Sequence, residues 1–409
     1  MQGMHEFREQ WRPLTACFIG MGAALSLNPY ILSIFAPYLL ADFGWTRSQW
    51  ALLGIPQLLV LVCIPAAGRL TDVLGVRRVV SVGAVAFPLL CVGIAMMDGS
   101  LAMFLGLYVA QTILGSTTTS AIYSRLAAEN FTARRGLALA ICGSAPALVA
   151  MVASPLLSAF VESHGWRTGY LVVAGYSACA SAIAIALIPA RSAGRQSGEA
   201  AAAKTCGGAA GVYRRVARMP AFWLLMVGCF LVNLPHAIAS AQLKMVVLDQ
   251  GASASQAALL VSVFAIGVTA GRFLSGIALD ALPPHLVAAV GLGLPLPGLL
   301  LLASNLDSMP WLVAAIMLIG LSFGSEGDVI AYLVVRQFGM GVFSTVLGLL
   351  TATMGGAMAT GAMLLGVLLE RTDSFDAYLL LSAGAVTVGS LLFLALERFP
   401  RMAGAEATA

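Results

Sequence analysis

Residues 68–78 read GRLTDVLGVRR, and this short charged stretch lies in a chain that otherwise avoids charge. Only 10% of the 409 residues are Asp, Glu, Lys or Arg, whereas 60% are hydrophobic, and the mean hydropathy is +0.93. Soluble domains carry about 25% charged residues, so the composition excludes an ordinary water-soluble protein. We therefore expect the charged stretch to be a loop between membrane-spanning helices.

The apolar runs on either side of this stretch are long enough to cross a membrane, which takes roughly 20 helical residues. The sequence predicts an all-α membrane protein with twelve transmembrane helices. The predicted spans are 14–40, 48–67, 79–97, 101–126, 136–160, 167–189, 220–247, 255–280, 286–303, 310–335, 342–369 and 375–396.

Basic residues are distributed unevenly between the loops of this topology. An even number of spans puts both termini on one side, and most Arg and Lys side chains fall on that side: Arg8, Arg12, Arg69, Arg77, Arg78, Arg125, Arg134, Arg135, Arg191, Arg195, Lys204, Arg214, Arg215, Arg218, Arg336, Arg398 and Arg401. The opposite side receives Arg47, Arg167, Arg371 and Lys244. The positive-inside rule then places both termini on the cytoplasmic side of the membrane. We expect that membrane to be a bacterial-type inner membrane. The net charge of +4 reflects this bias and does not indicate nucleic-acid binding.

The two halves of the chain contain similar motifs at corresponding positions. GIALDALPPH, residues 276–285, follows the eighth span as GRLTDVLGVRR follows the second, and Gly276 and Asp280 lie 208 residues after Gly68 and Asp72. Arg125 and Arg336 end the fourth and tenth spans at nearly the same offset. The sequence thus predicts two pseudo-symmetric six-helix halves, a parallel duplication that transporters use, with the substrate site between the halves.

A break in hydropathy separates these halves. Residues 191–219 are rich in Gly, Ala and basic residues, which is typical of a flexible linker with a basic end near the membrane surface. We therefore expect an N-terminal half over 1–190, a cytoplasmic linker over 191–219 and a C-terminal half over 220–409.

GRLTDVLGVRR between the second and third spans resembles the signature loop of the major facilitator superfamily. That resemblance implies transport by alternating access. It also implies a cytoplasmic latch that holds one open state, formed by a close-packing glycine and paired charges. The residues expected in this gating set are Gly68, Asp72, Arg77, Arg78, Asp280, Arg125 and Arg336.

Further stretches resemble the monocarboxylate and oxalate/formate branch of that superfamily. They are PYLLADFGWTRSQWAL (37–52), RRGLALA (134–140), GRFLSGIALD (271–280) and EGDVIAYLVVRQFG (326–339). In the resembled branch, the arginine of this helix-eight motif binds the substrate carboxylate, and that role falls here on Arg272. The chemistry of Arg272 supports this role. A charge within a membrane span is expensive and indicates function, and a planar guanidinium suits a carboxylate. The alternative for Arg272 is a static ion pair with the tenth or eleventh span.

Two carboxylates two residues apart in the tenth span raise a separate question. Successive helical residues turn by about 100°, so Glu326 and Asp328 face directions about 200° apart and have different roles. We expect one to be an acid near Arg272 and the other to pair with a cytoplasmic arginine. Asp328 is favoured as the acid because Tyr332 shares its face. An acid beside an arginine can take up a proton when substrate occupies the arginine, which would couple transport to protons; a static structural pair is the alternative.

The chain departs from the resembled branch at three places. Val268 stands where lactate carriers place an acid, Asn28-Pro29-Tyr30 where they carry a first-span lysine, and residues 342–369 contain no Lys or Arg for a second cavity cation. A dicarboxylate would leave one charge unpaired beside a single arginine. The sequence therefore favours a monocarboxylate.

Polar side chains at middle depth complete the candidate substrate-binding set, although hydrogen bonding between helices is the alternative for each. With Arg272 and Tyr332, that set comprises Asn28, Tyr30, Tyr108, Gln111, Asn233 and His236.

The predicted function is secondary transport of a small organic monocarboxylate, coupled to a proton. The partners are the substrate anion, the proton and the lipid bilayer, and the carrier is expected to work as a monomer. Alternatives are an exchanger or exporter of a bulkier carboxylate, and a non-transporting sensor on a carrier fold. No nucleophile–base set, phosphate loop or metal spacing is present in the sequence, so we expect neither an enzyme nor a cofactor.

Overall fold

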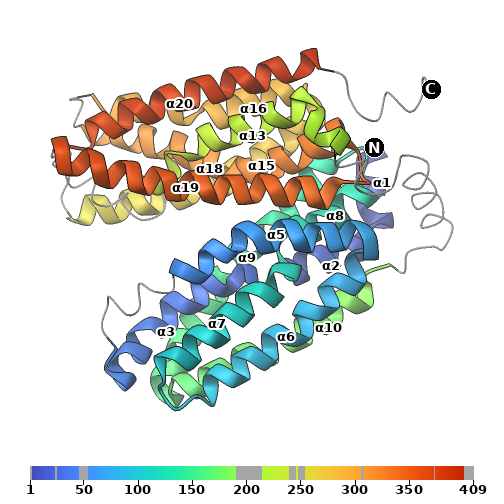
Figure 1. Cartoon of the computed structure of the whole chain (residues 1–409), viewed down its shortest axis with the longest axis vertical. Helices are drawn as coiled ribbons and strands as arrows, with labels where there is room; N and C mark the ends of the chain where they lie inside the picture. Colours follow the sequence, from blue (N-terminus) through green and yellow to red (C-terminus); the bar gives the residue numbers. More distant parts are fainter. Residues whose placement is uncertain are drawn as a thin grey trace. The chain divides into compact units, whose positions relative to one another are not determined.

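The computed structural model describes residues 2–23, 25–45, 54–189, 214–238, 246, 254–304, 308–372 and 374–399. The elements in these ranges are helices (Figure 1). Most of the predicted linker, 191–213, lies outside the described residues. The chain divides into two compact units. Unit 1 comprises 1–133, 141–198 and 340–352, and unit 2 comprises 134–140, 199–339 and 353–409.

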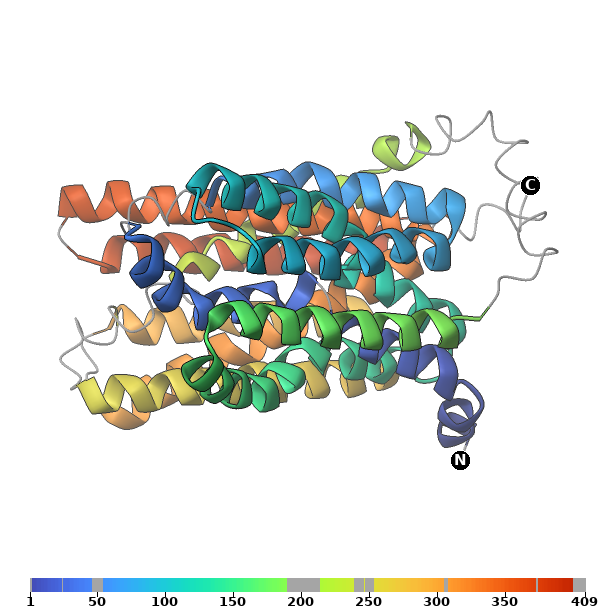
Figure 2. The same ribbon diagram turned by 90° about the horizontal axis from the view of Figure 1, so that it is seen from below.

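Unit 1 contains the N-terminal helices. They are α1 (Gln2–Glu9), α2 (Trp11–Met21), η1 (Leu25–Leu27), α3 (Asn28–Phe43), α5 (Gly54–Leu74), α6 (Val76–Ala95), α7 (Leu101–Gly115), η2 (Ser116–Thr118), α8 (Ser120–Asn130), most of α9 (Arg135–His164) and α10 (Trp166–Leu187). Figure 2 shows α10 as one unbroken ribbon and the short α1 next to the N-terminus. The core of this unit packs aromatic rings from several helices, with Phe35 stacked on Tyr170 at 4.0 Å between ring centroids.

Unit 2 contains the C-terminal helices. They are α13 (Pro220–Asn233), α15 (Ala254–Ala281), α16 (Pro284–Gly293), α17 (Pro295–Leu302), α18 (Met309–Phe338), most of α19 (Phe343–Thr372), α20 (Asp376–Ala395) and η4 (Leu396–Arg398). Helices α15 and α18 run side by side, and α13 packs against α20 (Figure 1).

Each predicted span corresponds to one or more helices of the described chain. Within the described residues, nine helices are long and apolar enough to cross a membrane. Two shorter apolar helices, Ile34–Phe43 and Pro220–Asn233, overlap the first and seventh predicted spans. The outer end of the seventh span lies outside the described residues.

Within the described residues, several predicted spans are interrupted helices rather than continuous ones, the seventh at a turn after Asn233. The first breaks between α2 and α3, the fourth at η2, and the ninth before Pro295. At η2 the hydroxyls of residues 116–119 donate to backbone carbonyls three residues earlier, at 2.7–3.0 Å. In a membrane such side chains satisfy backbone groups that an interrupted helix leaves open.

The pairing of α15 with α18 depends on glycines that let the two backbones touch. A Cβ atom at Gly271 would meet the carbonyl oxygen of Leu321, and one at Gly324 would meet that of Val268. Small residues at such positions are how membrane helices approach closely. This close approach brings the charged residues of α15 and α18 within reach of one another.

We expect Gly324→Ala to lower the thermal unfolding midpoint of the detergent-solubilised protein. The added methyl group would push α18 away from the α15 backbone, and overpacking of this kind costs about 1–3 kcal/mol. Gly327→Ala on the same helix is the matched control, because a Cβ there meets nothing within 4 Å. Equal midpoints for the two variants would contradict the glycine contact.

Candidate functional site

The charged pair inside unit 2 joins α15 to α18. Arg272 Nε lies 3.7 Å from Asp328 Oδ2, with the arginine side chain 22% exposed and the aspartate side chain 8% exposed. At this distance the ion pair is loose and is not a tight bidentate contact. Asp328 Oδ2 is buried and has no hydrogen-bond donor among the described residues. The pair therefore leaves hydrogen-bonding capacity on both partners.

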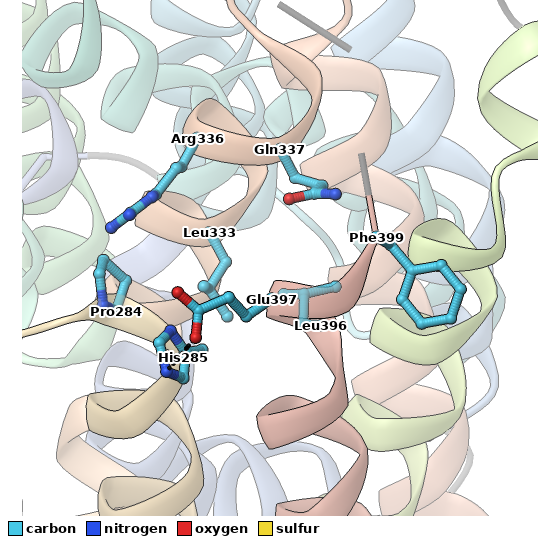
Figure 3. A pocket seen from close by; sticks show the side chains of 8 residues that line it. All are labelled: Pro284, His285, Leu333, Arg336, Gln337, Leu396, Glu397 and Phe399. Carbon is cyan, nitrogen blue, oxygen red and sulfur yellow. Dashed lines mark ion pairs between the residues drawn. The ribbon is translucent and has the colours of Figure 1, made fainter. Parts of the chain in front are cut away.

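Tyr332 and Arg336 follow Asp328 on α18 at successive turns, as the helical spacing predicts. Tyr332 is half-buried. Arg336 lines a small pocket at the end of α18, where Figure 3 shows the His285 and Glu397 side chains facing each other. His285 Nε2 lies 2.9 Å from Glu397 Oε2. That pocket measures about 20 Å³, which is room for about one water molecule, so it is not a substrate site.

Glu326 faces a different helix from Asp328. The Asn233 amide on α13 donates to Glu326 Oε1, and His236 Nδ1, just beyond α13, lies 3.4 Å from Glu326 Oε2. The His236 ring also packs against Phe323 at 4.5 Å between centroids. Asn233, His236 and Glu326 are all buried, and together they form a polar cluster that ties α13 to α18.

This cluster corrects one expectation. The two carboxylates do point to different neighbours, but Glu326 pairs with Asn233 and His236 and with no cytoplasmic arginine in the described chain. The physical reason is its place on α18. About three turns before the helix end, it faces Asn233 at the end of α13 and His236 just beyond it, so its partners are an amide and an imidazole.

A second set of charges surrounds Asp72 at the end of α5. Arg125 on α8 pairs with the Asp72 carboxylate, and both side chains are buried. Arg125 Nε also lies 2.6 Å from Glu129 Oε1. Asp72 further accepts hydrogen bonds from the backbone N–H of Ser344 at 3.1 Å and of Thr345 at 2.8 Å, and from the Thr345 hydroxyl at 2.6 Å.

Asp280, at the end of α15, makes the corresponding contact in unit 2. It accepts hydrogen bonds from the backbone N–H of Gly136 at 2.7 Å and of Leu137 at 3.1 Å. Each aspartate therefore binds the first turn of a long helix, α19 for Asp72 and α9 for Asp280. Carboxylates are favourable there because helix N-terminal N–H groups lack partners and carry partial positive charge.

Two glycines lie at these contacts, whereas the other residues expected in the gate have different surroundings. A Cβ at Gly68 would meet the Ser344 carbonyl, and one at Gly276 would meet the backbone of Gly136. Arg77 and Arg78 are exposed in the first turn of α6. Arg125 and Arg336, expected to be equivalent, have different surroundings, since Arg125 pairs with Asp72 whereas Arg336 lines the small pocket.

The polar residues predicted in the N-terminal half all lie in unit 1. Asn28 is buried, and its amide nitrogen has no hydrogen-bond partner in the described part of the chain. Tyr30 is exposed. Tyr108 and Gln111 are buried on α7, where Gln111 Nε2 lies 3.4 Å from Cys91 Sγ. Gln111 thus holds α7 to α6, which is the packing role that polar groups commonly have in membranes.

Ser344, Thr345 and Glu129 were not among the predicted residues. Glu129 could have been found, because it follows Arg125 by four residues on one helix. The other signal is the repeat: Ser344 and Thr345 lie 208 residues after Gly136 and Leu137, which is the offset between Asp72 and Asp280. Within the described residues no group of His, Cys, Asp and Glu side chains could hold a metal ion.

Two proteins named monocarboxylate transporters are similar to this chain in sequence. The human protein "Monocarboxylate transporter 11" is 27% identical over 346 residues, which are 82% of this chain and 71% of that protein. The bovine protein "Monocarboxylate transporter 13" is 27% identical over 286 residues, covering 69% of this chain and 64% of that protein.

Solved structures share its fold at lower identity. An E. coli fucose:proton symporter superposes with a TM-score of 0.72 at 14% identity, covering 95% of this chain and 98% of that one. A proton:xylose symporter gives 0.70 at 13% identity, covering 98% and 96%. The human organic anion transporter MFSD10 gives 0.67 at 18% identity, covering 95% and 98%.

The Major Facilitator Superfamily model matches residues 14–362, which is most of the chain. The helices, the two units and the similar structures agree with that match. The chain therefore belongs to the major facilitator superfamily, as a multi-pass membrane protein that acts as a secondary transporter and not as an enzyme.

Proposed function

We propose that this carrier moves a small organic monocarboxylate together with a proton by alternating access. The observation that carries the proposal is the partly buried Arg272–Asp328 pair between α15 and α18. The pair is loose, at 3.7 Å, and Asp328 Oδ2 has no hydrogen-bond donor among the described residues. A substrate carboxylate that binds Arg272 would find a guanidinium not already fully used.

Charge balance links substrate binding to a proton. The empty pair is neutral, because the guanidinium and the carboxylate cancel. A substrate anion bound to Arg272 would leave the site with one net negative charge, which is expensive in a buried environment. If Asp328 takes up a proton at the same time, the loaded site is neutral again. Proton and anion therefore enter together, which is symport.

The number of cations favours one carboxylate per substrate. Arg272 presents a planar fork that binds a carboxylate through two hydrogen bonds, and residues 342–369 contain neither Lys nor Arg. The similarity to proteins named monocarboxylate transporters supports the same substrate class.

Glu326 has a separate role in this proposal. Both of its carboxylate oxygens face partners on or just beyond α13, from Asn233 and His236, so it holds α18 to α13 whether or not substrate is bound. Asp328, which faces Arg272, is the coupling acid.

We expect Arg272→Gln to abolish gradient-driven uptake. The test is uptake of lactate, pyruvate, formate, oxalate and benzoate into proteoliposomes, with and without an inward proton gradient. Two charge-assisted hydrogen bonds contribute about 3 kcal/mol or more, so uptake should fall by about 100-fold or more. Arg371→Gln, which removes an exposed arginine from the end of α19, is the control and should transport normally.

Uptake that survives Arg272→Gln would make this arginine a structural charge. Transport of none of these acids by the wild type would leave the fold unaffected and refute the substrate class.

We expect Asp328→Asn to separate substrate movement from the proton. The variant cannot exchange a proton at that position, so a pH gradient should no longer drive accumulation, whereas counterflow of labelled against unlabelled substrate should persist. Glu326→Gln is the matched control on the same helix and should keep its response to the gradient. Gradient-driven accumulation by Asp328→Asn, or its loss in Glu326→Gln alone, would assign the coupling to Glu326. Equal exchange and no gradient response in the wild type would identify an exchanger.

The contacts of Asp72 and Asp280 would act as the gate. Each carboxylate binds two backbone N–H groups of a first helical turn, and these bonds must break if the helix end moves away during the cycle. The residues Gly68, Arg77, Arg78, Arg125, Gly276 and Arg336 would set how tightly those ends are held.

We expect Asp72→Asn and Asp280→Asn to change the maximal transport rate far more than the KM. An amide lacks the negative charge that stabilises a helix N-terminus, and loss of charge-assisted bonds would shift the balance between open states by about 1–2 kcal/mol, or roughly 5- to 30-fold. Initial rates of uptake against substrate concentration measure both quantities. Asp376→Asn, at the exposed start of α20, is the control. A change confined to the KM would argue against a gate.

A further inference from the structure

A groove in unit 1 lies outside the proposed substrate site. It is formed by Trp11 and Arg12 at the start of α2, Arg77 at the start of α6, and residues 186–189 at the end of α10. Helix α10 packs against both α2 and α6, and α6 and α10 lie side by side in Figure 1. The groove has a volume of about 430 Å³, which is within the range of small-ligand sites.

No acidic side chain of the described residues compensates the charge of this groove. Within the described residues, neither Arg12 nor Arg77 forms an ion pair. The acidic residues nearest to them along the chain are engaged elsewhere. Glu6 accepts hydrogen bonds from the loop before α9, Glu9 pairs with His5 and Asp72 with Arg125. Two exposed guanidiniums in one groove therefore attract an anion.

The other lining groups favour an amphipathic anion over a small one. Trp11 is 49% exposed, and the Arg12 guanidinium carbon lies 5.6 Å from its ring centroid. Tryptophan is enriched where membrane and water meet. Exposed apolar side chains continue along α6 from its charged end, at Val82, Val85 and Leu89. A ligand with a negative head and apolar chains would match both parts.

We propose that this groove binds the headgroup of an anionic phospholipid. The phosphate would lie between Arg12 and Arg77, the indole of Trp11 would pack at the level of the glycerol, and the acyl chains would run along α6. Basic pockets between transmembrane helices bind acidic lipids in this way. Both arginines belong to the side of the membrane that carries most of the chain's basic residues, so the lipid would come from that leaflet.

Such a lipid would join three elements of unit 1. It would contact α2, α6 and the end of α10, and it would neutralise Arg77 within the charged stretch that precedes and begins α6. The site is separate from the Arg272–Asp328 pair, which lies in unit 2, so it does not depend on which solute is transported.

Native mass spectrometry of the full-length protein in detergent tests the proposal, with phosphatidylglycerol and phosphatidylcholine as probes. We expect the wild type to retain one phosphatidylglycerol in preference to phosphatidylcholine. Arg12→Gln or Arg77→Gln should each weaken that retention about fivefold, and the double variant about 25-fold. Trp11→Ala should weaken the binding of both lipids. Arg214→Gln, which removes an exposed arginine outside the groove, should retain the lipid as the wild type does.

The comparison of the two lipids on the wild type does not depend on any variant folding. Equal retention of phosphatidylglycerol and phosphatidylcholine would overturn the proposal. So would unchanged retention in the double arginine variant, or displacement of the lipid by millimolar inorganic phosphate, which would identify a free-anion site.

Discussion

The cost of placing charge inside an apolar helix bundle is the constraint on which the rest of this structure depends. An isolated arginine within a membrane span costs about 2.5–3.5 kcal/mol on insertion scales, so Arg272 needs a neighbouring acid, and Asp328 is that neighbour at 3.7 Å. The acid can be there only because α15 and α18 touch through Gly271 and Gly324. The ion pair therefore depends on the close backbone packing, because separating the two helices would leave both charges without this partner.

Hydropathy predicted the helices well because a membrane span is a local property of the sequence. A run of about 20 apolar residues is sufficient to identify it. Each of the twelve predicted runs overlaps at least one helix of the described residues. The interruptions were not predicted. At residues 116–119 and before Pro295 the chain stays apolar or weakly polar while the backbone leaves the helix, and hydropathy averages over such short departures. Hydroxyl side chains at residues 116–119 support the first interruption through hydrogen bonds to the backbone, and Pro295, which lacks a backbone N–H, accompanies the second.

The same distinction applies to the candidate site. Helical periodicity correctly separated Glu326 from Asp328, since the angle between two positions on one helix follows from their spacing. It could not give the neighbour that each faces. Asn233 and His236, which face Glu326, lie some 90 residues earlier in the sequence, and only the packing of α13 against α18 brings them there. A single sequence therefore gives the direction of a side chain within an element, whereas its partner is a property of the fold.

The duplication explains which features the two halves share. Asp72 and Asp280 both bind the first turn of a long helix, through backbone N–H groups that are themselves 208 residues apart. At that same offset the charged pairs differ. Ile64 and Ser120 correspond to Arg272 and Asp328, and Leu333 corresponds to Arg125. A backbone contact needs only an aspartate and a helix end, so both halves keep it. An ion pair needs two complementary side chains, and the pair has a different position in each half: it joins α5 to α8 in unit 1 and α15 to α18 in unit 2. The symmetric contacts suit a scaffold that both halves must share, whereas the asymmetric charges suit a single site for an asymmetric solute.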